Sequence, residues 1–448
     1  MSSCFVRVIM PTCVSMANYR SEKFSPLAKS SEKSSRAIVH EVVAQHAEET
    51  SFLWLLRHAA VSQPNYSLTD LSKLDNRVEA HLDGLRIAGE AGWEVVQETL
   101  PFRESCDLFA AGSLAFESGK PDWIDFVLDL AAKKPEVISG VISALGWLTY
   151  EQARPDIEAL VVSHSSNSRA IGIAASAIHR VNPGSILGEA ISDSDPFVRA
   201  RALRAVGELG RVDLLPRMRG GLSDPDKNAR FATAWSVTLL SSNVDSLSVL
   251  RSIAESPGPL SHKALQTAIR RMDSASAKAW QVWFSRRKDG MRAAIAAAGA
   301  IGDPELVPWL IGQMNAPIFA RPAGEAFTMI TGVDLAYDDL EKKAPDGFEA
   351  GPTDDPGDEN VEMDPDEHLP WPDPALIHKW WTQNQRRFQK GTRSLFGKPM
   401  TIDWLRQVLR IGRQRQRAAA ALELAIRQPG QPLFEVRAPG FRQQAALK

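Results

Sequence analysis

Cysteine is scarce in this sequence of 448 residues, and the net charge is close to zero. The three cysteines, Cys4, Cys13 and Cys106, have a spacing that fits neither a disulfide framework nor a zinc site. The 52 basic residues nearly balance the 54 acidic ones, and the formal net charge of −2 gives no overall attraction to nucleic acid. We therefore expect a protein of a reducing compartment, the cytoplasm.

Long apolar runs are missing as well. The chain has no run of about 18 consecutive apolar residues, which is what a membrane-spanning helix needs. The short apolar patch near the N-terminus is interrupted by Pro11, and it lacks the arrangement of a secretory signal. We expect no membrane insertion.

Recognisable catalytic and ligand-binding motifs are also absent. In "HEVVAQH", His40 and His46 are six residues apart, whereas a zinc-protease helix needs histidines four apart so that both project from one face. "GTRSLFGKP" lacks the spacing of a phosphate-binding loop, and "DDPGDEN" lacks the register of a calcium loop. The sequence thus predicts no catalytic residue, no cofactor and no metal site.

An internal repeat is what the sequence does contain. "ALGWLT", "AVGELG" and "AAGAIG" are variants of one motif, and their first glycines are Gly146, Gly207 and Gly299. The separations of 61 and 92 residues are two and three copies of a period of about 30 residues, which lies in the range of solenoid repeats. Glycine and alanine at these positions let adjacent helices approach closely.

Basic residues keep the same period. They recur at intervals of 29 to 33 residues, as Arg169, Arg199, Arg230, Lys263, Arg292 and Arg321. We expect each arginine to pair with a turn aspartate of its own or a neighbouring repeat, although a row of arginines lining a concave binding surface is the alternative. These arginines and the three glycines are therefore predicted to be structural.

Each repeat has the form of two helices joined by a turn. For example, "VDLLPRMRGGLSDPD" precedes "KNARFATAWSVTLL", and apolar residues recur at helical spacing in both. The turn "DSDP" supplies an N-cap aspartate and a proline suited to a first helical turn. Because one pair cannot cover its own apolar face, the pairs must stack. The predicted fold is an all-α, right-handed α-solenoid of HEAT-like helix pairs.

The stretch "DSDPFVRARALRAVGELG" resembles a HEAT repeat of the short, roughly 30-residue kind, and this resemblance covers about Asp107 to Leu335. Four further stretches are similar to a family of uncharacterised bacterial HEAT-repeat proteins often encoded near type VI secretion genes: "LDNRVEAHLDGLRIAGEAGW", "HLPWPDP", "GRQRQRAAAALELA" and "PGQPLFEVRAPGFRQ". The resemblance implies a cytoplasmic bacterial protein associated with effector loading or assembly of the secretion apparatus. It supplies no catalytic residue.

We expect five segments along the chain. They are a disordered tail (1–35), a helical N-terminal cap with helices over 36–54 and 74–100 (36–105), the repeat array (106–335), an acidic flexible excursion (336–372) and a helical C-terminal region (373–448). The last segment holds a further repeat-like helix pair over 401–410 and 414–427. Its "QRAAAALELAI" places Arg417 where Arg199 sits in the array.

The C-terminal region also carries the candidate partner-binding residues. A basic cluster lies beside tryptophans in this region, and the candidates are Arg410, Arg413, Arg415, Arg417, Trp380 and Trp381. These side chains either contact a partner, including the phosphates and bases of a nucleic acid, or have structural roles. In the structural interpretation the tryptophans pack in the C-terminal core and the arginines form a solvated helix face.

Three classes of function remain open. The favoured one is a non-enzymatic protein-binding scaffold or adaptor, whose partner the family resemblance narrows to a secretion-system component or effector. The second is an enzyme on a helical-repeat scaffold, resembling bilin lyases or HEAT-like DNA glycosylases. The third is an immunity protein that neutralises a neighbouring toxin by placing the acidic excursion over a basic cleft.

Overall fold

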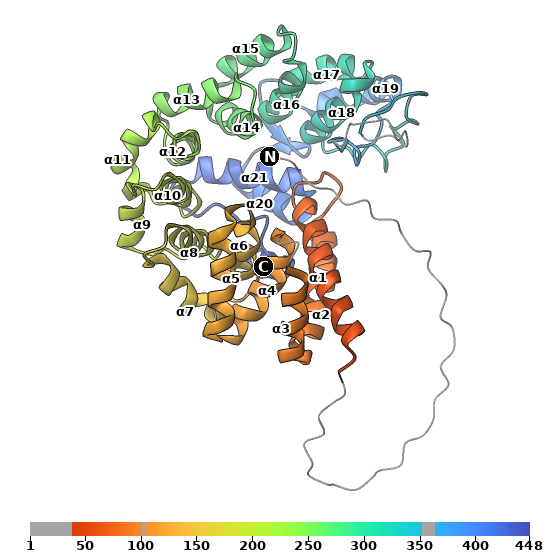
Figure 1. Cartoon of the computed structure of the whole chain (residues 1–448). Helices are drawn as coiled ribbons and strands as arrows, with labels where there is room; N and C mark the ends of the chain where they lie inside the picture. Colours follow the sequence, from red (N-terminus) through yellow and green to blue (C-terminus); the bar gives the residue numbers. More distant parts are fainter. Residues whose placement is uncertain (1–37, 101–103, 352–362) are drawn as a thin grey trace, which may run out of the picture.

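The computed structural model describes residues 38–100, 104–351 and 363–448 (Figure 1). These residues form 22 α-helices, several short 3-10 turns and one hairpin of two short strands, and the helices follow one another in a long arc. The prediction of an all-α solenoid is confirmed. The expected tail, with Cys4 and Cys13, lies outside the described residues.

The N-terminal cap contains three helices, α1 (His40–Ala60), α2 (Leu68–Ala88) and α3 (Glu90–Thr99), where the sequence predicted two. Ser67 begins α2 as a capping box, in which its hydroxyl accepts from the Asp70 amide and the Asp70 carboxylate accepts from the Ser67 amide at 3.0 Å. Gly89, at φ 60°, separates α2 from α3. A left-handed residue of this kind ends a helix at little cost only when it is glycine.

The array that follows has an inner and an outer row of helices (Figure 1). The inner row is α4 (Ser105–Ser118), α6 (Ile138–Trp147), α8 (Ser166–Ile178), α10 (Pro196–Glu208), α12 (Lys227–Leu240), α14 (Ser261–Arg271), α16 (Met291–Ile301) and α18 (Pro317–Thr331). The outer row is α5 (Pro121–Lys133), α7 (Tyr150–Val161), α9 (Ser185–Ala190), α11 (Leu215–Met218), α13 (Val244–Ala254), α15 (Ser274–Ser285) and α17 (Val307–Gln313).

The repeat glycines lie where one inner helix meets the next. A Cβ added at Gly207 of α10 would lie 2.5 Å from Oγ and 2.9 Å from Cα of Ser236 in α12. Gly146 meets Ile178 of α8 in the same way, and Gly299 meets Ala326 of α18. The sequence period of about 30 residues is therefore the interval along the chain at which close contacts between neighbouring inner helices recur.

The outer helix around residue 215 is shorter than the sequence predicted. "VDLLPRMRGGLSDPD" forms a 3-10 turn (Val212–Leu214), α11 and a second 3-10 turn (Arg219–Ser223) rather than one helix. Paired glycines at 220 and 221 weaken helix propagation at this point. The next inner helix begins as predicted, because the Asp226 carboxylate accepts from the Ala229 amide at 2.8 Å and caps α12.

The C-terminal region does not extend the array. It consists of α19 (Pro374–Asn384), β1 (Ser394–Leu395), β2 (Lys398–Pro399), α20 (Ile402–Ile411), α21 (Gln414–Arg427) and α22 (Gly440–Ala446). Helices α20 and α21 pair with each other as predicted, but they lie inside the arc, and α21 contacts α12 and α14 (Figure 1). Ala425 and Ile426 of α21 belong to the same buried apolar cluster as the array.

Residues 393–443, here called the return segment, contact the carboxyl ends of α16 and α18 first and then run back to α10. The Phe396 amide donates to the Met329 carbonyl in α18 at 2.7 Å, and the Ser394 amide donates to the Gly302 carbonyl after α16 at 2.8 Å. Farther on, the Leu433 amide donates to the Glu208 carbonyl of α10 at 3.0 Å. Carbonyls at the carboxyl ends of α10, α16 and α18 thus find donors in the return segment.

The return segment ends against the N-terminal cap. Arg57 of α1 donates to the Ala438 carbonyl at 2.9 Å, and the Gly440 amide donates to the buried Asp75 carboxylate of α2 at 2.6 Å. Arg57 and Asp75 also form a buried ion pair of 2.8 Å. On its other side the cap contacts the first repeat, where Arg86 of α2 pairs with Glu117 of α4 at 2.6 Å. The cap is therefore bonded both to the first repeat and to the return segment.

None of the helices in the described ranges combines the length and the apolar character needed to cross a bilayer.

Substitution of Gly207 tests the close contact between inner helices. Gly207→Ala is expected to lower the free energy of unfolding by about 1–3 kcal/mol, because its Cβ would overlap Ser236 and force α10 and α12 apart. Urea denaturation measures the change. Gly312→Ala in α17 is the matched control, since nothing lies within 4 Å of the added Cβ, and it should be neutral or stabilising. Equal effects of the two substitutions would contradict this interpretation.

Candidate interaction surfaces

The repeat arginines lie near the amino ends of the inner helices, where they join successive repeats. Arg169 of α8 pairs with Asp193 at 2.9 Å, and Arg199 of α10 pairs with Asp224 at 2.6 Å. Arg199 also donates to the Asp193 carbonyl at 2.7 Å, and Arg230 donates to the Asp224 carbonyl. Each of these guanidinium groups therefore holds the turn of its own repeat, and Arg169 and Arg199 also reach the turn that follows.

The last two repeat arginines pair instead with the acidic excursion. Arg321 of α18 contacts Asp364 at 2.6 Å, and Arg292 of α16 contacts Asp366. The Asp366 amide donates to the Asp364 carboxylate at 3.0 Å, which repeats the turn bond of 2.9 Å between the Asp195 amide and the Asp193 carboxylate. The excursion thus supplies the aspartate turn that a further repeat would have supplied.

Arg321 fixes both described parts of the excursion. Its guanidinium carbon lies 4.6 Å from the ring centroid of Trp371 and 5.5 Å from that of Phe348, and its side chain is only 7% exposed. The Lys342 amide also donates to the Trp371 carbonyl at 2.8 Å. Residues 338–351 and 363–373 are therefore held to the array, whereas the sequence predicted a flexible excursion. Residues 352–362 are outside the described ranges.

Arg417, one of the candidate partner-binding residues, is fully buried in α21. It donates to the Leu409 carbonyl at 2.7 Å and to the side-chain oxygens of Gln414 and Gln443. Burial lowers the pKa of the guanidinium to about 10, so the group remains charged at neutral pH. The sequence aligned Arg417 with Arg199, but the structure gives it partners inside the C-terminal region and no path to a partner molecule.

Arg413 and Arg415 join the two ends of the arc. Arg415 donates to the Ser62 carbonyl after α1 at 2.9 Å and pairs with Glu325 of α18 at 2.8 Å. Arg413 donates to the Asn65 carbonyl at 2.7 Å, and its guanidinium lies 3.7 Å from the Asp334 carboxylate. These two candidates close the arc into a ring, and their charge is largely used within the chain.

The tryptophan candidates lie on α19, away from this closure. Trp381 is buried in a cluster with Phe388 and Ile377, and Trp380 packs against the same cluster. Helix α19 contacts α17 at the end of the outer row. The structure therefore places Trp380 and Trp381 in a core, as the structural interpretation expected, rather than beside the arginines as stacking partners for bases.

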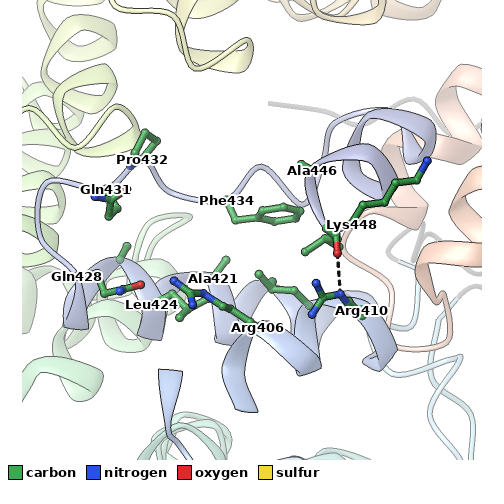
Figure 2. A pocket seen from close by; sticks show the side chains of 13 residues that line it. Arg406, Arg410, Ala421, Leu424, Gln428, Gln431, Pro432, Phe434, Ala446 and Lys448 are labelled. Carbon is green, nitrogen blue, oxygen red and sulfur yellow. Dashed lines mark hydrogen bonds between the residues drawn. The ribbon is translucent and has the colours of Figure 1, made fainter. Parts of the chain in front are cut away.

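Arg410 is exposed, and it lies at the edge of a small pocket lined by α20, α21 and residues 431–434 and 446–448 (Figure 2). Its Nε donates to the Leu447 carbonyl at 2.7 Å. The pocket has a volume of about 220 Å³ and is lined mainly by apolar side chains such as Leu424 and Phe434, with Arg406 on one side. It is smaller than the roughly 300–1,000 Å³ typical of pockets for drug-sized ligands.

Arg393 is a central residue that the sequence gave no reason to single out. Its guanidinium donates to the Ile301 and Arg270 carbonyls at 3.0 Å each, to the Ala300 carbonyl at 3.2 Å, and to the buried Glu423 carboxylate. It thereby ties α14, α16 and α21 together. No local pattern marks such a residue, because its partners are 30 to 123 residues away in the chain.

A buried carboxylate sits at the end of α10. Glu208 contacts Arg201 and, at 2.8 Å, Arg204, and its backbone carbonyl accepts from Leu433. Burial alone would raise the pKa of Glu208, but the charges of Arg201, Arg204 and Arg180 outweigh it and lower the pKa from 4.5 to about 2. The carboxylate is therefore ionised at neutral pH and contributes to stability there.

Over the described part of the chain, no group of three or more histidine, cysteine, aspartate or glutamate side chains is arranged to hold a metal ion.

Comparison with known protein families identifies HEAT repeats at residues 185–270, which run from α9 into α14. The chain therefore carries HEAT repeats, as the sequence predicted for this stretch. A search of curated proteins gave no match.

The low pKa of Glu208 predicts acid sensitivity. A carboxylate whose pKa is lower in the folded than in the unfolded state contributes stability above the unfolded value, and this contribution is lost as pH falls from about 4.5 to 2. Its size is on the order of 3 kcal/mol. Thermal unfolding of the wild type and of Glu208→Gln across pH 2–7 should show a smaller dependence on pH in the variant. Parallel curves would exclude this role for Glu208.

Removal of the Arg321 side chain should release the excursion. Arg321→Leu loses the ion pair to Asp364 and the contacts with Trp371 and Phe348, so limited proteolysis should cut within residues 338–373 at least several-fold faster than in the wild type. Arg251→Leu is the matched control, because Arg251 is half exposed and its partners, Glu255 and the ring of Trp280, are not part of the excursion. Unchanged cleavage of Arg321→Leu would show that other contacts hold the excursion.

Proposed function

We propose that this chain is a protein-binding scaffold. The observation that carries the proposal is the HEAT-repeat match at 185–270, within an array whose inner helices stack continuously from α4 to α18. Repeats of this kind expose extended surfaces on which other proteins dock, and each repeat contributes a similar patch. The return segment covers the carboxyl ends of the inner helices, so the outer row and the amino-terminal rim remain for a partner.

The resemblance to a bacterial family encoded near type VI secretion genes supports a finer proposal, in which the partner is a secretion component or an effector. In this proposal the protein is an adaptor that loads or assembles such components. The resemblance rests on stretches of the N-terminal cap, of residues 368–374 and of the return segment. The cap and the return segment are bonded to each other through Arg57 and Asp75.

The immunity role gains no support from Asp364 and Asp366, two acids of the excursion. It would place the acidic excursion over a basic toxin cleft, but Asp364 and Asp366 are paired with Arg321 and Arg292 of the array. A toxin would have to compete with these intramolecular pairs. We therefore place the adaptor first.

The first experiment is capture of the tagged protein from the bacterium that encodes it, with mild cross-linking and mass spectrometry. We expect a small set of proteins in near-stoichiometric amount, and co-expression of each with the purified chain should reconstitute a complex that co-elutes in size-exclusion chromatography. A strain that carries the tag alone is the control. Recovery of an effector, spike or sheath protein supports the adaptor, and a co-encoded toxin supports the immunity role. Recovery of the chain alone, or of nucleic acid, contradicts the scaffold.

A further inference from the structure

Helix α1 carries apolar side chains on two faces. One face packs against α2 and α4, where Leu53 and Trp54 are buried and Trp54 stacks on Phe109 of α4. On the other face large apolar side chains are exposed, among them Val42, Phe52, Leu55 and Leu56. A helix that is apolar all round is normally buried on every side. The second face of α1 is therefore unusual, because the described part of the chain leaves it open.

Acids share this open face with the apolar side chains. Residues seven apart in an α-helix lie almost on one line, because two turns contain about seven residues. One such line along α1 holds Glu41, Glu48 and Leu55. The neighbouring line and the space between the two lines hold Val42, Phe52 and Leu56. We call these six exposed residues the α1 stripe.

The glutamates of the α1 stripe have no basic partner among the described residues. Helix α1 forms ion pairs there through His40, with Glu98 of α3 at 3.5 Å, and through Arg57, with Asp75 of α2. Neither Glu41 nor Glu48 takes part in one. The stripe is thus apolar toward the carboxyl end of α1 and carries uncompensated negative charge in its first half.

This combination of charge and apolar surface indicates what the stripe binds. Apolar positions that recur at intervals of three and four residues suit packing against a second helix. Lysine or arginine side chains of that helix would neutralise Glu41 and Glu48, and its apolar side chains would cover Phe52, Leu55 and Leu56. The complementary surface is therefore an amphipathic helix that carries basic residues beside its apolar face.

Two other occupants suit the stripe less well. If a second copy of the chain docked with α1 parallel to α1, each glutamate would meet its own copy. In an antiparallel pair that spans the whole stripe, the two Glu48 side chains would meet at the centre, and like charges repel. The surface of an anionic membrane attracts basic helices and would repel both glutamates.

We propose that the α1 stripe is a docking site for a basic amphipathic helix of a partner protein. The inference rests on the proposed scaffold function and specifies where the partner binds and by what chemistry. Helix α1 lies at one end of the array, so the N-terminal cap adds a surface to those that the repeats leave open (Figure 1).

The first test measures binding of two fluorescein-labelled peptides to the full-length protein by fluorescence anisotropy. The basic peptide has three copies of Leu-Ala-Lys-Leu-Lys-Arg-Ala, and the acidic peptide has glutamate at each basic position. The basic peptide should bind at least tenfold more tightly, and its binding should weaken as salt increases. The net charge of the protein, −2, is too small to produce this preference by general attraction.

Charge reversal on α1 identifies the site of binding. Glu41→Lys with Glu48→Lys should raise the Kd of the basic peptide at least tenfold and lower the Kd of the acidic peptide by a similar factor. The matched control is Asp122→Lys with Asp129→Lys on α5, two exposed acids that are also seven residues apart. It makes the same change in net charge and should leave both Kd values within about twofold.

Removal of apolar side chains tests the other half of the stripe. Phe52→Ser with Leu55→Ser should raise the Kd of the basic peptide at least tenfold. Phe197→Ser with Val212→Ser is the control, because these side chains are about as exposed, at 46% and 42% against 43% and 41%. Thermal unfolding shows whether each variant is folded. A wild type that does not bind the basic peptide, or equal losses in the stripe and control variants, overturns the proposal.

Photocross-linking in the bacterium that encodes the protein identifies what occupies the stripe. With p-benzoylphenylalanine in place of Phe52, the cross-linked peptide should come from another protein and have the sequence of a basic amphipathic helix. The cross-link should be lost when Glu41→Lys and Glu48→Lys are added, and retained with Asp122→Lys and Asp129→Lys. A cross-link to residues 1–37 or to a second copy of the chain overturns the proposal.

Failure here can be distinguished from failure of the scaffold function. If capture from cells yields a partner that binds the wild type and the Glu41→Lys, Glu48→Lys variant equally, the scaffold stands and the site on α1 is refuted. If neither the cellular capture nor the peptides give a complex, both fail.

Discussion

The carboxyl ends of the inner helices are the constraint on which the rest of this structure depends. Each helix leaves carbonyl oxygens unpaired at its end, and the helix dipole makes that end negative. In this chain arginines donate to carbonyls at several helix ends: Arg271 to Ser241 after α12 and to Ile426 of α21, Arg393 to Ile301 of α16, and Arg442 to Leu148 after α6. The return segment and the array are therefore joined through backbone carbonyls. If either part were absent, these carbonyls would be exposed to water.

Because the return segment occupies the inside of the arc, the array differs from an open solenoid. An open array flexes, since each repeat contacts only its neighbours. Here Arg393 spans α14, α16 and α21, and Arg415 links the residues after α1 to α18. Bending the arc would break these contacts at several points together, so the ring should respond to load as one body.

Local features of the fold could be predicted from the sequence because their causes are local. The period of glycine and arginine, the aspartate caps and the bounds of α21 all follow from interactions within one or two repeats. The place of α20 and α21 could not be predicted in the same way. Their sequence has the pattern of a repeat, and only contacts with residues up to 353 positions away put them inside the ring.

The candidate partner-binding residues show the same contrast between local patterns, which the sequence reveals, and distant contacts, which it does not. Sequence identified Arg413, Arg415 and Arg417 as an unusual basic cluster, but their partners Asn65, Glu325 and Gln443 lie on other elements and carry no motif. Composition likewise described residues 336–372 as an acidic excursion without showing that Asp364 and Asp366 form a turn that Arg321 and Arg292 bind. Charge counts cannot distinguish a solvated acid from a paired one.

The bond between Asp75 and Gly440 joins residues 365 positions apart. It can therefore form only after nearly the whole chain has been synthesised. Domains generally fold from the amino terminus during synthesis, and local helix pairs form long before distant segments meet. The repeats can therefore stack as they emerge from the ribosome, with the inside of the arc still empty. Until residues 393–443 have been made, that inner surface exposes apolar side chains and unpaired carbonyls, and a nascent chain at this stage is a natural client for chaperones.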